Sequence, residues 1–320
     1  GGYFMRGNDS GHRNEEELFL GVDFGGSNAK MVALRGDGEQ QASRHAQTPD
    51  VPDDPKGNLQ RRVTALREFY AYVADTHGSV DGIGVSSPGL AARNNRYTYD
   101  LPGKMWGVEG TDWEEALDLG VTARVINDAH AALMAEHWLG AAAGMENVVL
   151  LTLGTGVGGA LLVNGRLVQG HHGRAGHFGH IIMDPRGPSD IFDVPGSLEW
   201  LVGNATVPAR TNYRWRDIES LVRDYEAGDR LASRHWLTMI DTLAAGIVSI
   251  INSVDPEAVV LSGGVTAAGQ TLFKPLRGAV ARYEWQPQGI TVPVIPAKFG
   301  ELAGAIGAAK FIRDRVGPQQ

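Results

Sequence analysis

Cysteine is absent from this chain of 320 residues, which excludes a disulfide framework and any metal site built from thiolates. An excess of positive charge is also lacking, since 29 lysines and arginines stand against 37 aspartates and glutamates and give a net charge of -8. Such an acidic chain is a poor partner for nucleic acid or an anionic membrane. We find no continuous apolar run near the roughly 20 residues that cross a bilayer, and no signal-peptide core before Leu18. These absences favour a cytoplasmic protein.

The polar N-terminus, residues 1–17, is expected to be a disordered tail. Within it, Gly1–Phe4 precede Met5 and are expected to be a remnant of protein expression. In the chain as a whole, hydrophobic residues make up 42% of the sequence, which is enough to bury the cores of two domains of ordinary size.

Strand patterns alternate with helix patterns from Leu18 onward, which is typical of the α/β class. Helical periodicity is expected over 59–77, 113–119, 128–139, 197–202, 215–225, 231–253 and 302–313. We expect a small domain over 18–124, against which a C-terminal helix in 300–314 packs back, and a large domain over 125–299. Each would contain a strand, a glycine turn and a hairpin followed by helices. The two lobes would leave a cleft, which is a common place for a ligand.

Two glycine-rich turns each follow an apolar run that is expected to be a strand. Asp23-Phe24-Gly25-Gly26-Ser27-Asn28 follows the run Leu18–Val22, and Gly154-Thr155-Gly156-Val157-Gly158-Gly159 follows the run Val148–Leu153. Glycine lets the backbone turn sharply and bring its N–H groups close to an anion. The candidate phosphate-binding residues are Gly25, Gly26, Ser27, Gly154, Thr155, Gly156 and Gly158. Together the turns predict the phosphate clamp of a nucleotide-dependent phosphotransferase.

Asp23 ends the first apolar run beside the first glycine turn. In a phosphoryl-transfer site, this carboxylate would orient Mg²⁺ directly or through water. The alternative interpretation is a hairpin turn capped by an aspartate.

The second glycine turn also matches the dinucleotide pattern GxGxxG, through Gly154, Gly156 and Gly159. A dinucleotide-binding fold needs a helix after the last glycine, whereas Ala160–Gly165 has the pattern of a strand and a turn. A β-hairpin with the Thr155 hydroxyl near the β- and γ-phosphates fits the sequence better.

Asn127 and Asp128 lie where an expected strand passes into an expected helix. Both residue types are favoured helix caps, so a structural role is a strong alternative. The functional alternative makes Asp128 a general base, because a carboxylate within hydrogen-bond reach of a sugar hydroxyl can accept its proton during attack on a phosphate. Beside two phosphate turns we favour the catalytic role.

Four histidines cluster in a segment rich in glycine and proline: His171, His172, His177 and His180. Imidazole is a common metal ligand, but no HExxH pattern supports a metal here. We favour a loop that lines the substrate site, with His177 and His180 bonding to sugar hydroxyls.

Two carboxylates are further candidate sugar ligands. Glu199 lies near the start of an expected helix, where it would either cap the helix or accept a bond from a sugar hydroxyl. Asp100 lies near Trp106 and Trp113, and these aromatic residues would either form a wall for a sugar or pack in the core.

The residues together resemble the ROK family of sugar kinases and sugar-responsive repressors, within the actin/hexokinase/Hsp70 ATPase superfamily. The resemblance runs from about Leu18 to about Arg313. The segments that carry it are Asp23-Phe24-Gly25-Gly26-Ser27, Val125-Ile126-Asn127-Asp128-Ala129, Gly154-Thr155-Gly156-Val157-Gly158-Gly159, Ala175-Gly176-His177-Phe178-Gly179-His180 and Leu261-Ser262-Gly263-Gly264-Val265.

The resemblance implies a two-lobed actin-like ATPase fold of the ribonuclease H-like type, with an interdomain cleft that closes by domain motion. It also implies a kinase that uses ATP with Mg²⁺ to phosphorylate a hexose hydroxyl, with Asp128 as the base and Asn127 holding the sugar. Ser262, Gly263 and Gly264 would face the adenosine. A homodimer or homotetramer is expected, since this is common among ROK-like kinases.

The chain departs from the family pattern in two places. His177 stands where the family usually has a glutamate that accepts bonds from sugar hydroxyls, and imidazole offers one acceptor at most. The family's usual zinc site combines the second histidine, here His180, with three cysteines, and Ser197 stands in the place of the last one. Structural zinc is therefore not expected. The repressor branch carries an N-terminal helix-turn-helix domain, for which the tail before Leu18 leaves no room.

Two alternatives to a hexose kinase remain. His177 in place of glutamate is compatible with a non-catalytic sugar or nucleotide sensor that has kept the fold. It is equally compatible with a kinase for a non-glucose acceptor, such as an amino sugar or a polyol.

Overall fold

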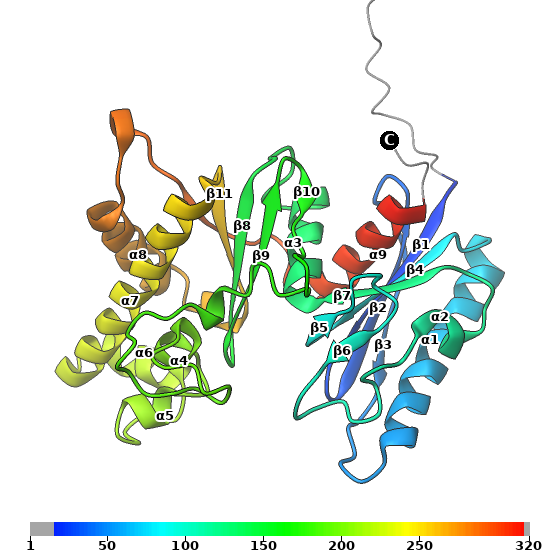
Figure 1. The fold of residues 1–320 in the computed structure, drawn as a ribbon, viewed down its shortest axis with the longest axis horizontal. Coiled ribbons are helices and arrows are strands. Elements are labelled where there is room, and N and C mark those ends of the chain that lie inside the picture. The colour runs from blue at the N-terminus through cyan, green and yellow to red at the C-terminus, as the bar shows by residue number, and fades with distance from the viewer. Residues whose placement is uncertain (1–15, 317–320) are drawn as a thin grey trace, which may run out of the picture. The chain divides into compact units, whose positions relative to one another are not determined.

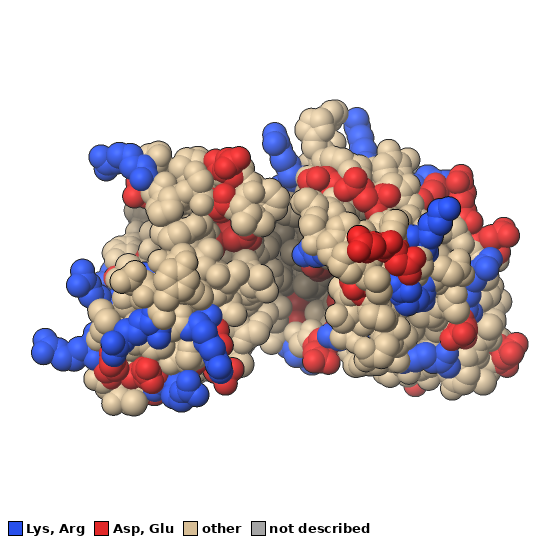
Figure 2. All heavy atoms as spheres, turned by 90° about the horizontal axis from the view of Figure 1, so that it is seen from below, with Lys and Arg blue, Asp and Glu red and all other residues tan. Residues whose placement is uncertain are grey.

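The computed structural model describes residues 16–316, so most of the expected tail lies outside the described residues. These residues form two compact units, one made of 16–138 with 301–316 and the other of 139–300 (Figure 1). Each unit has a five-stranded mixed sheet, which confirms the predicted α/β class. Acidic side chains lie among the basic ones on the face of both units that Figure 2 shows.

The sheet of the first unit has the strand order β3-β2-β1-β4-β7. Its strands are β1 (Leu18–Phe24), β2 (Asn28–Arg35), β3 (Gln40–Gln47), β4 (Gly82–Ser87) and β7 (Ala123–Asn127). The first three form an antiparallel meander, whereas β4 and β7 run parallel to β1. Because β7 pairs with β4, and α3 (Asp128–Leu139) follows it against α9 (Ala303–Val316), the first unit extends to Trp138 rather than ending at Arg124.

Helices cover both faces of this sheet, because large and glycine residues alternate along its central strands. Leu20 of β1 packs in one buried cluster with Phe69 of α1 (Pro55–His77). Gly21, the next residue of β1, points to the opposite face. There α9 comes so close that a Cβ on Gly21 would lie 1.8 Å from the carbonyl oxygen of Ala305. Glycine at this position therefore allows the C-terminal helix to pack on the sheet.

A short ribbon and a short helix complete the first unit. They are β5 (Leu90–Ala91), β6 (Thr98–Asp100) and α2 (Trp113–Leu117). Trp113 is fully buried and stacks on Phe24, with 5.0 Å between the ring centroids. Trp113 is therefore a core residue and not part of a wall for a sugar, while Trp106 is 40% exposed.

The second unit repeats the topology of the first, with the strand order β10-β9-β8-β11-β12. Its strands are β8 (Val148–Leu153), β9 (Val157–Val163), β10 (Arg166–Leu167), β11 (Ala258–Ser262) and β12 (Val294–Pro296). The first three again form a meander, and β11 and β12 again run parallel to the first strand. The β8–β9 hairpin confirms the strand expected after the second glycine turn and excludes the dinucleotide motif, which needs a helix there.

The helices of the second unit pack against one face of its sheet. They are α4 (Leu198–Val202), α5 (Val207–Arg210), α6 (Ile218–Glu226), α7 (Arg230–Val254) and α8 (Gln270–Tyr283), with the 3-10 helices η1 (Phe178–His180), η2 (Gly264–Ala268) and η3 (Pro287–Gly289). By length and composition α7 could cross a membrane, with a mean hydropathy of 1.6 over 18 residues. It contains no uninterrupted apolar run of that length, because polar residues interrupt its apolar ones, so the sequence did not predict it as such a candidate. Half of that window is buried, and Trp236 and Leu243 lie in the core cluster. These features are typical of a core helix.

The sequence patterns did not identify β3 and α8. The residues of β3 are either half-buried or exposed, and none is fully buried. The strand therefore shows no alternation of apolar and polar residues. α8 contains Pro275 and Gly278, which are both poor helix formers, and its order comes from packing against α7.

The close approach of α9 predicts that Gly307→Ala destabilises the protein. A Cβ on Gly307 would lie 1.6 Å from the carbonyl oxygen of Ala131 in α3, so the two helices would have to separate. We expect the free energy of unfolding to fall by about 1–3 kcal/mol. Urea unfolding followed by circular dichroism measures this change.

Gly278→Ala in α8 is the matched control. Its new Cβ would meet only the end of Arg282, at 3.8 Å, so helix propensity alone should raise the stability by up to about 1 kcal/mol. Equal effects of the two substitutions would contradict the close packing at Gly307.

Candidate active site

The carboxyl ends of β1, β4 and β7 meet at one edge of the sheet of the first unit. Asp23 lies in register with Ser86, and Ser87 lies in register with Asn127. Parallel strands bring their last residues to the same edge, which is the usual ligand position in α/β sheets. The fold thus brings Asp23 to the same edge as Asn127 and Asp128, which are far from it in the sequence.

The first glycine turn joins β1 to β2 at the same edge. The Gly25 N–H group donates to the carbonyl oxygen of Asn28 at 2.9 Å, and Ser27 is exposed at the tip. Neither Gly25 nor Gly26 has a positive φ, and a Cβ on Gly26 would meet no atom within 4 Å. Neither backbone conformation nor packing therefore requires glycine at position 26, which is the pattern expected where a ligand approaches the backbone.

Asp23 is held from two sides. Its Oδ1 accepts a hydrogen bond from the Ser86 hydroxyl at 2.8 Å, and a Cβ on Gly304 of α9 would lie 2.6 Å from its carboxyl carbon. Burial raises the pKa of Asp23 to about 6, and the nearby Asp128 carboxylate adds to the shift, while the Ser86 bond and Lys30 oppose it. Ionised Asp23 therefore costs the native state free energy at neutral pH.

Asn127 is the cap of α3. Its Oδ1 accepts bonds from the N–H groups of Ala129 at 2.9 Å and His130 at 3.4 Å, and its Nδ2 donates to the carbonyl oxygen of Gly89 at 2.8 Å. Both lone pairs of the amide oxygen are thus occupied, and one N–H remains for a ligand. Asn127 is 5% exposed, so its main role in the structure is to fix the start of α3 and with it Asp128.

Asp128 is the first residue of α3 and is exposed. Burial nevertheless raises the pKa of Asp128, whereas the positive charge of Lys104 and the backbone N–H of Ala129 lower it. Asp128 is therefore open to solvent while partial burial still disfavours its charged form. Lys104 lies in a loop that no sequence pattern connects with Asp128, so the sequence analysis missed it.

Asp100 lies at the exposed end of β6, on the ribbon that is tied to this edge. It pairs with Leu90, and a Cβ on Gly89 would lie 2.2 Å from the Asp100 carbonyl oxygen. Because Gly89 also accepts the bond from Asn127, the backbone of Asp100 is fixed close to the sheet edge.

The two nucleotide turns predicted in the second unit lie side by side. β8 and β11 are parallel neighbours, with Thr152 in register with Ser262. Gly263 has a φ of 95° and packs against β8, where a Cβ would lie 2.3 Å from the carbonyl oxygen of Leu153. Thr155 is exposed at the tip of the β8–β9 turn. The structure thus brings Thr155 and Ser262 to one end of the second sheet.

Two glycines of these turns repeat the pattern of Gly26. A Cβ on Gly154 or on Gly264 would meet no atom within 4 Å, and neither residue has a positive φ. Gly300 shares this property outside any predicted turn. Each of the three candidate nucleotide turns therefore contains at least one glycine that neither packing nor a positive φ requires.

Glu199 of α4 contacts the second glycine turn. Its Oε2 accepts a hydrogen bond from the Val157 N–H group at 3.0 Å, and a Cβ on Gly156 would lie 2.1 Å from that oxygen. Glycine at 156 is thus explained by Glu199, while Gly158 is a strand residue opposite Thr152. One carboxylate oxygen of Glu199 thus binds the turn through the Val157 N–H group, and the other oxygen is not used in this contact.

The predicted histidine pair brackets η1. His177 is half-buried at its start, and His180 is exposed at its end, with its ring centroid 5.2 Å from that of Phe192. His171 and His172 contact each other, at 4.6 Å between ring centroids. Residues 16–316 contain no group of three or more histidines, aspartates or glutamates arranged to hold a metal ion. The described part of the chain thus gives no support to a histidine metal site.

The loop before α4 is organised by Asp190. Its Oδ1 accepts bonds from the N–H groups of Phe192 at 2.8 Å and Val194 at 3.1 Å, and its Oδ2 accepts a bond from the Ser197 hydroxyl at 2.7 Å. Burial alone would raise the pKa of Asp190, but these bonds and the nearby His180 hold it below its ordinary value. A carboxylate network therefore includes Ser197, the residue at the position of the last cysteine of the zinc pattern.

Known proteins are similar to this chain along nearly its whole length. The model of the ROK family matches residues 19–315. A glucokinase of Thermotoga maritima is 31% identical over 93% of this chain and 98% of its own length, and a glucokinase of Halalkalibacterium halodurans is 29% identical over 94% and 96%. The crystal structure of a ROK hexokinase from Thermus thermophilus superposes with a TM-score of 0.82 at 29% identity, covering 93% of this chain and 99% of that one.

The raised pKa of Asp23 predicts that Asp23→Asn stabilises the protein at neutral pH. The unfolded carboxyl titrates near its ordinary 3.8 and the native one near 6, so native stability falls as the pH rises between these values. Asparagine removes that cost and still accepts the Ser86 bond. We expect the free energy of unfolding to rise by about 1–2 kcal/mol at pH 8, and little change at pH 4.

Urea unfolding of both proteins at the two pH values measures this difference. A loss of stability at pH 8 would show that the ionised carboxylate stabilises the native state.

Proposed function

Because this chain belongs to the ROK family, we propose that it is an ATP-dependent carbohydrate kinase, which transfers the γ-phosphoryl group of ATP to a hydroxyl of a hexose or hexose derivative. The observation that carries the proposal is the pair of carboxylates, Asp23 and Asp128, at the carboxyl edge of a parallel sheet beside a glycine turn. The similarity to glucokinases over nearly the whole chain supports the same class of activity.

The glycine turns supply the phosphate donors in this proposal. The turn at Gly25, Gly26 and Ser27 would bind the transferring phosphoryl group through backbone N–H groups. The turn at Gly154 and Thr155 would bind the β- and γ-phosphates, and Ser262–Gly264 would face the adenosine. Support comes from the glycines at 26, 154 and 264, because neither packing nor a positive φ requires glycine there, whereas an approaching ligand would.

Asp23 has the properties of a ligand for Mg²⁺. It is an oxygen donor whose pKa is raised by burial and by a second carboxylate, and a divalent cation would relieve both effects. When bound, Mg²⁺ would neutralise phosphate charge, with Asp23 holding it directly or through water.

Asp128 acts as the general base. The sugar hydroxyl oxygen forms a bond to the γ-phosphorus while the bond from that phosphorus to the bridging oxygen breaks, and ADP leaves with the electron pair. The hydroxyl proton passes to Asp128. The raised pKa of Asp128 makes its carboxylate a stronger base than an ordinary aspartate, provided the pH is high enough to ionise it.

The remaining candidate site residues are proposed as sugar ligands. Asp100 is exposed beside the sheet edge and accepts from hydroxyls, and Asn127 offers its remaining N–H group. His177, His180 and the second oxygen of Glu199 are proposed for the same task. Since His177 replaces the usual glutamate, the preferred sugar is expected to differ from that of a glucokinase.

Asp128→Asn is predicted to fold and bind sugar but to lose turnover. Removing a general base is expected to lower kcat by about 10²–10⁴-fold. An ADP-coupled assay with Mg-ATP measures this across glucose, mannose, fructose, allose, N-acetylglucosamine, N-acetylmannosamine, glucosamine and inositol. Calorimetry with the best acceptor checks that the variant still binds it.

The same assay separates the alternatives. Sugar-dependent ADP release that Asp128→Asn abolishes establishes the kinase and its acceptor class, including an amino sugar or a polyol. Sugar binding by the wild type without ADP release would overturn the kinase in favour of a sensor. Retained turnover in the variant would remove Asp128 as the base.

His177→Glu is predicted to shift the acceptor preference towards glucose-like sugars. The carboxylate restores two acceptor oxygens where imidazole offers at most one. We expect kcat/KM for glucose to rise relative to that for the best acceptor, by roughly 10-fold or more.

His171→Glu is the control for the added negative charge, because His171 is exposed on the same segment and is no proposed ligand. If both variants keep the wild-type order of sugars, His177 does not contact the substrate.

A further inference from the structure

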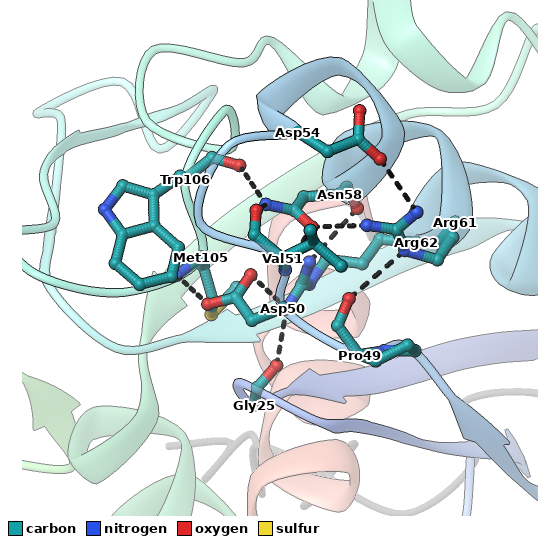
Figure 3. A network of polar contacts seen from close by, with 10 residues as sticks. All are labelled: Gly25, Pro49, Asp50, Val51, Asp54, Asn58, Arg61, Arg62, Met105 and Trp106. Carbon is teal, nitrogen blue, oxygen red and sulfur yellow. Dashed lines mark hydrogen bonds and ion pairs between the residues drawn. The ribbon is translucent and has the colours of Figure 1, made fainter.

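A buried ion pair in the first unit connects the first glycine turn to the loop that carries Lys104. Arg62 of α1 is 0% exposed, and Figure 3 shows it among the residues that it contacts. Its Nη2 donates to the carbonyl oxygen of Gly25 at 2.9 Å and lies 3.3 Å from Asp50 Oδ1, while its Nη1 donates to the carbonyl oxygen of Asn58 at 3.1 Å. One guanidinium thus joins α1, the segment before it and the phosphate turn.

Asp50 carries the connection onward. Its Oδ2 accepts a hydrogen bond from the N–H group of Met105, which is fully buried and has a φ of 49° (Figure 3). A non-glycine residue keeps such a conformation only where its surroundings impose it. Beside it, Asn58 Nδ2 donates to the carbonyl oxygen of Trp106 at 3.1 Å. A Cβ on Gly107 would lie 2.0 Å from the Pro55 carbonyl oxygen, so this part of the loop also rests on α1.

Both ends of this connection lie at the proposed reaction centre of the first unit. Gly25 directly follows the strand that ends in Asp23 and Phe24. Met105 directly follows Lys104, whose charge acts on Asp128. The path from Gly25 through Arg62 and Asp50 to Met105 therefore joins the phosphate turn to the loop beside the base.

Stability alone gives little reason for a buried ion pair. Taking two charges out of water costs about as much as their attraction returns, and apolar replacements of similar volume are often as stable. Burial lowers the pKa of Arg62, because it disfavours the charged guanidinium, while the attraction of Asp50 raises it. The cost of burial and the attraction within the pair therefore oppose each other. Unlike apolar side chains, the pair forms directed hydrogen bonds to two segments at once, at Gly25 and at Met105.

We propose that Arg62 and Asp50 are positioning residues, which hold the first glycine turn and the loop around Lys104 and Met105 in one arrangement. A phosphate bound at the turn and an acceptor hydroxyl at Asp128 then meet at reacting distance. This inference rests on the proposed kinase function. Neither residue touches the reactants.

Asp50→Asn tests the inference with almost no change of shape. The amide can no longer accept from both Arg62 and Met105, so the loop loosens. We expect kcat to fall roughly 10- to 100-fold, while KM for ATP and for the sugar stays within about 3-fold. The acidic limb of the pH–rate profile should move to higher pH, because a displaced Lys104 no longer favours ionised Asp128.

Asp54→Asn is the matched control, at the N-cap of the helix that carries Arg62. Asp54 pairs with Arg61 at 3.1 Å, but these side chains are 48% and 31% exposed, and asparagine caps a helix as well as aspartate does. The control loses the same charge without touching the path to Met105, so kcat should change less than about 2-fold. Equal kcat values for Asp50→Asn and Asp54→Asn would overturn the inference and leave the kinase intact.

The double variant Arg62→Met/Asp50→Leu separates positioning from stability. It replaces the pair with apolar side chains, so the protein should keep its unfolding midpoint and still lose kcat. Loss of kcat only in proportion to lost folded protein would make the pair merely structural.

Hydrogen exchange of the protein without ligands gives a readout that needs no activity. The Met105 amide should exchange faster in Asp50→Asn and in Arg62→Lys, and at the wild-type rate in Asp54→Asn. Unchanged exchange in the first two variants would overturn the inference. A wild type without sugar-dependent turnover would overturn the proposed function, and the exchange rates would still decide whether the pair holds the loop.

Discussion

The burial of two carboxylates at one sheet edge is the constraint on which the candidate site of the first unit depends. The parallel strands bring Asp23 and the start of α3 to the same edge, and partial burial makes the charge of Asp23 and Asp128 costly. Neighbouring groups reduce this cost in part. Ser86 donates to Asp23, Lys30 lies near it, and Lys104 acts on Asp128. None of them removes the cost, so both carboxyl groups keep a raised pKa.

Close backbone packing sets the place of this pair. α9 lies on β1 and β4 through glycines that leave no room for a side chain, and Gly304 brings the helix directly against the Asp23 carboxyl group. The C-terminal segment, far from Asp23 in the sequence, therefore determines where that carboxylate lies. The second unit uses the same device at Gly263, which lets the turn after β11 rest on the end of β8.

Local patterns in the sequence predicted much of this arrangement. The glycine turns after β1 and β8, the β8–β9 hairpin and the bounds of α3 follow from runs of apolar residues and from residues at their ends, so they are readable without the fold. β3 and α8 were not predicted, because one lacks an apolar period and the other contains Pro275. The order of both comes from neighbouring elements.

The contacts of the site were less predictable, since they join distant residues of ordinary type. Arg62 lies in a helix pattern like any surface arginine, and nothing in the sequence shows that it is buried against Gly25 and Asp50. Glu199 was expected to cap a helix or to accept from a sugar, and the bond that it accepts from Val157 in the second glycine turn was not predicted. Which side chains meet is decided by tertiary packing, and a single sequence does not contain that information in a local form.

The Asp190 network has a consequence for the conditions under which the loop before α4 keeps its shape. A carboxylate bonded to two backbone N–H groups and to Ser197 contains no thiolate that an oxidant could modify. These bonds hold the pKa of Asp190 below its ordinary value. The network therefore keeps its form at neutral pH and weakens under acid, as the pH falls through that lowered pKa.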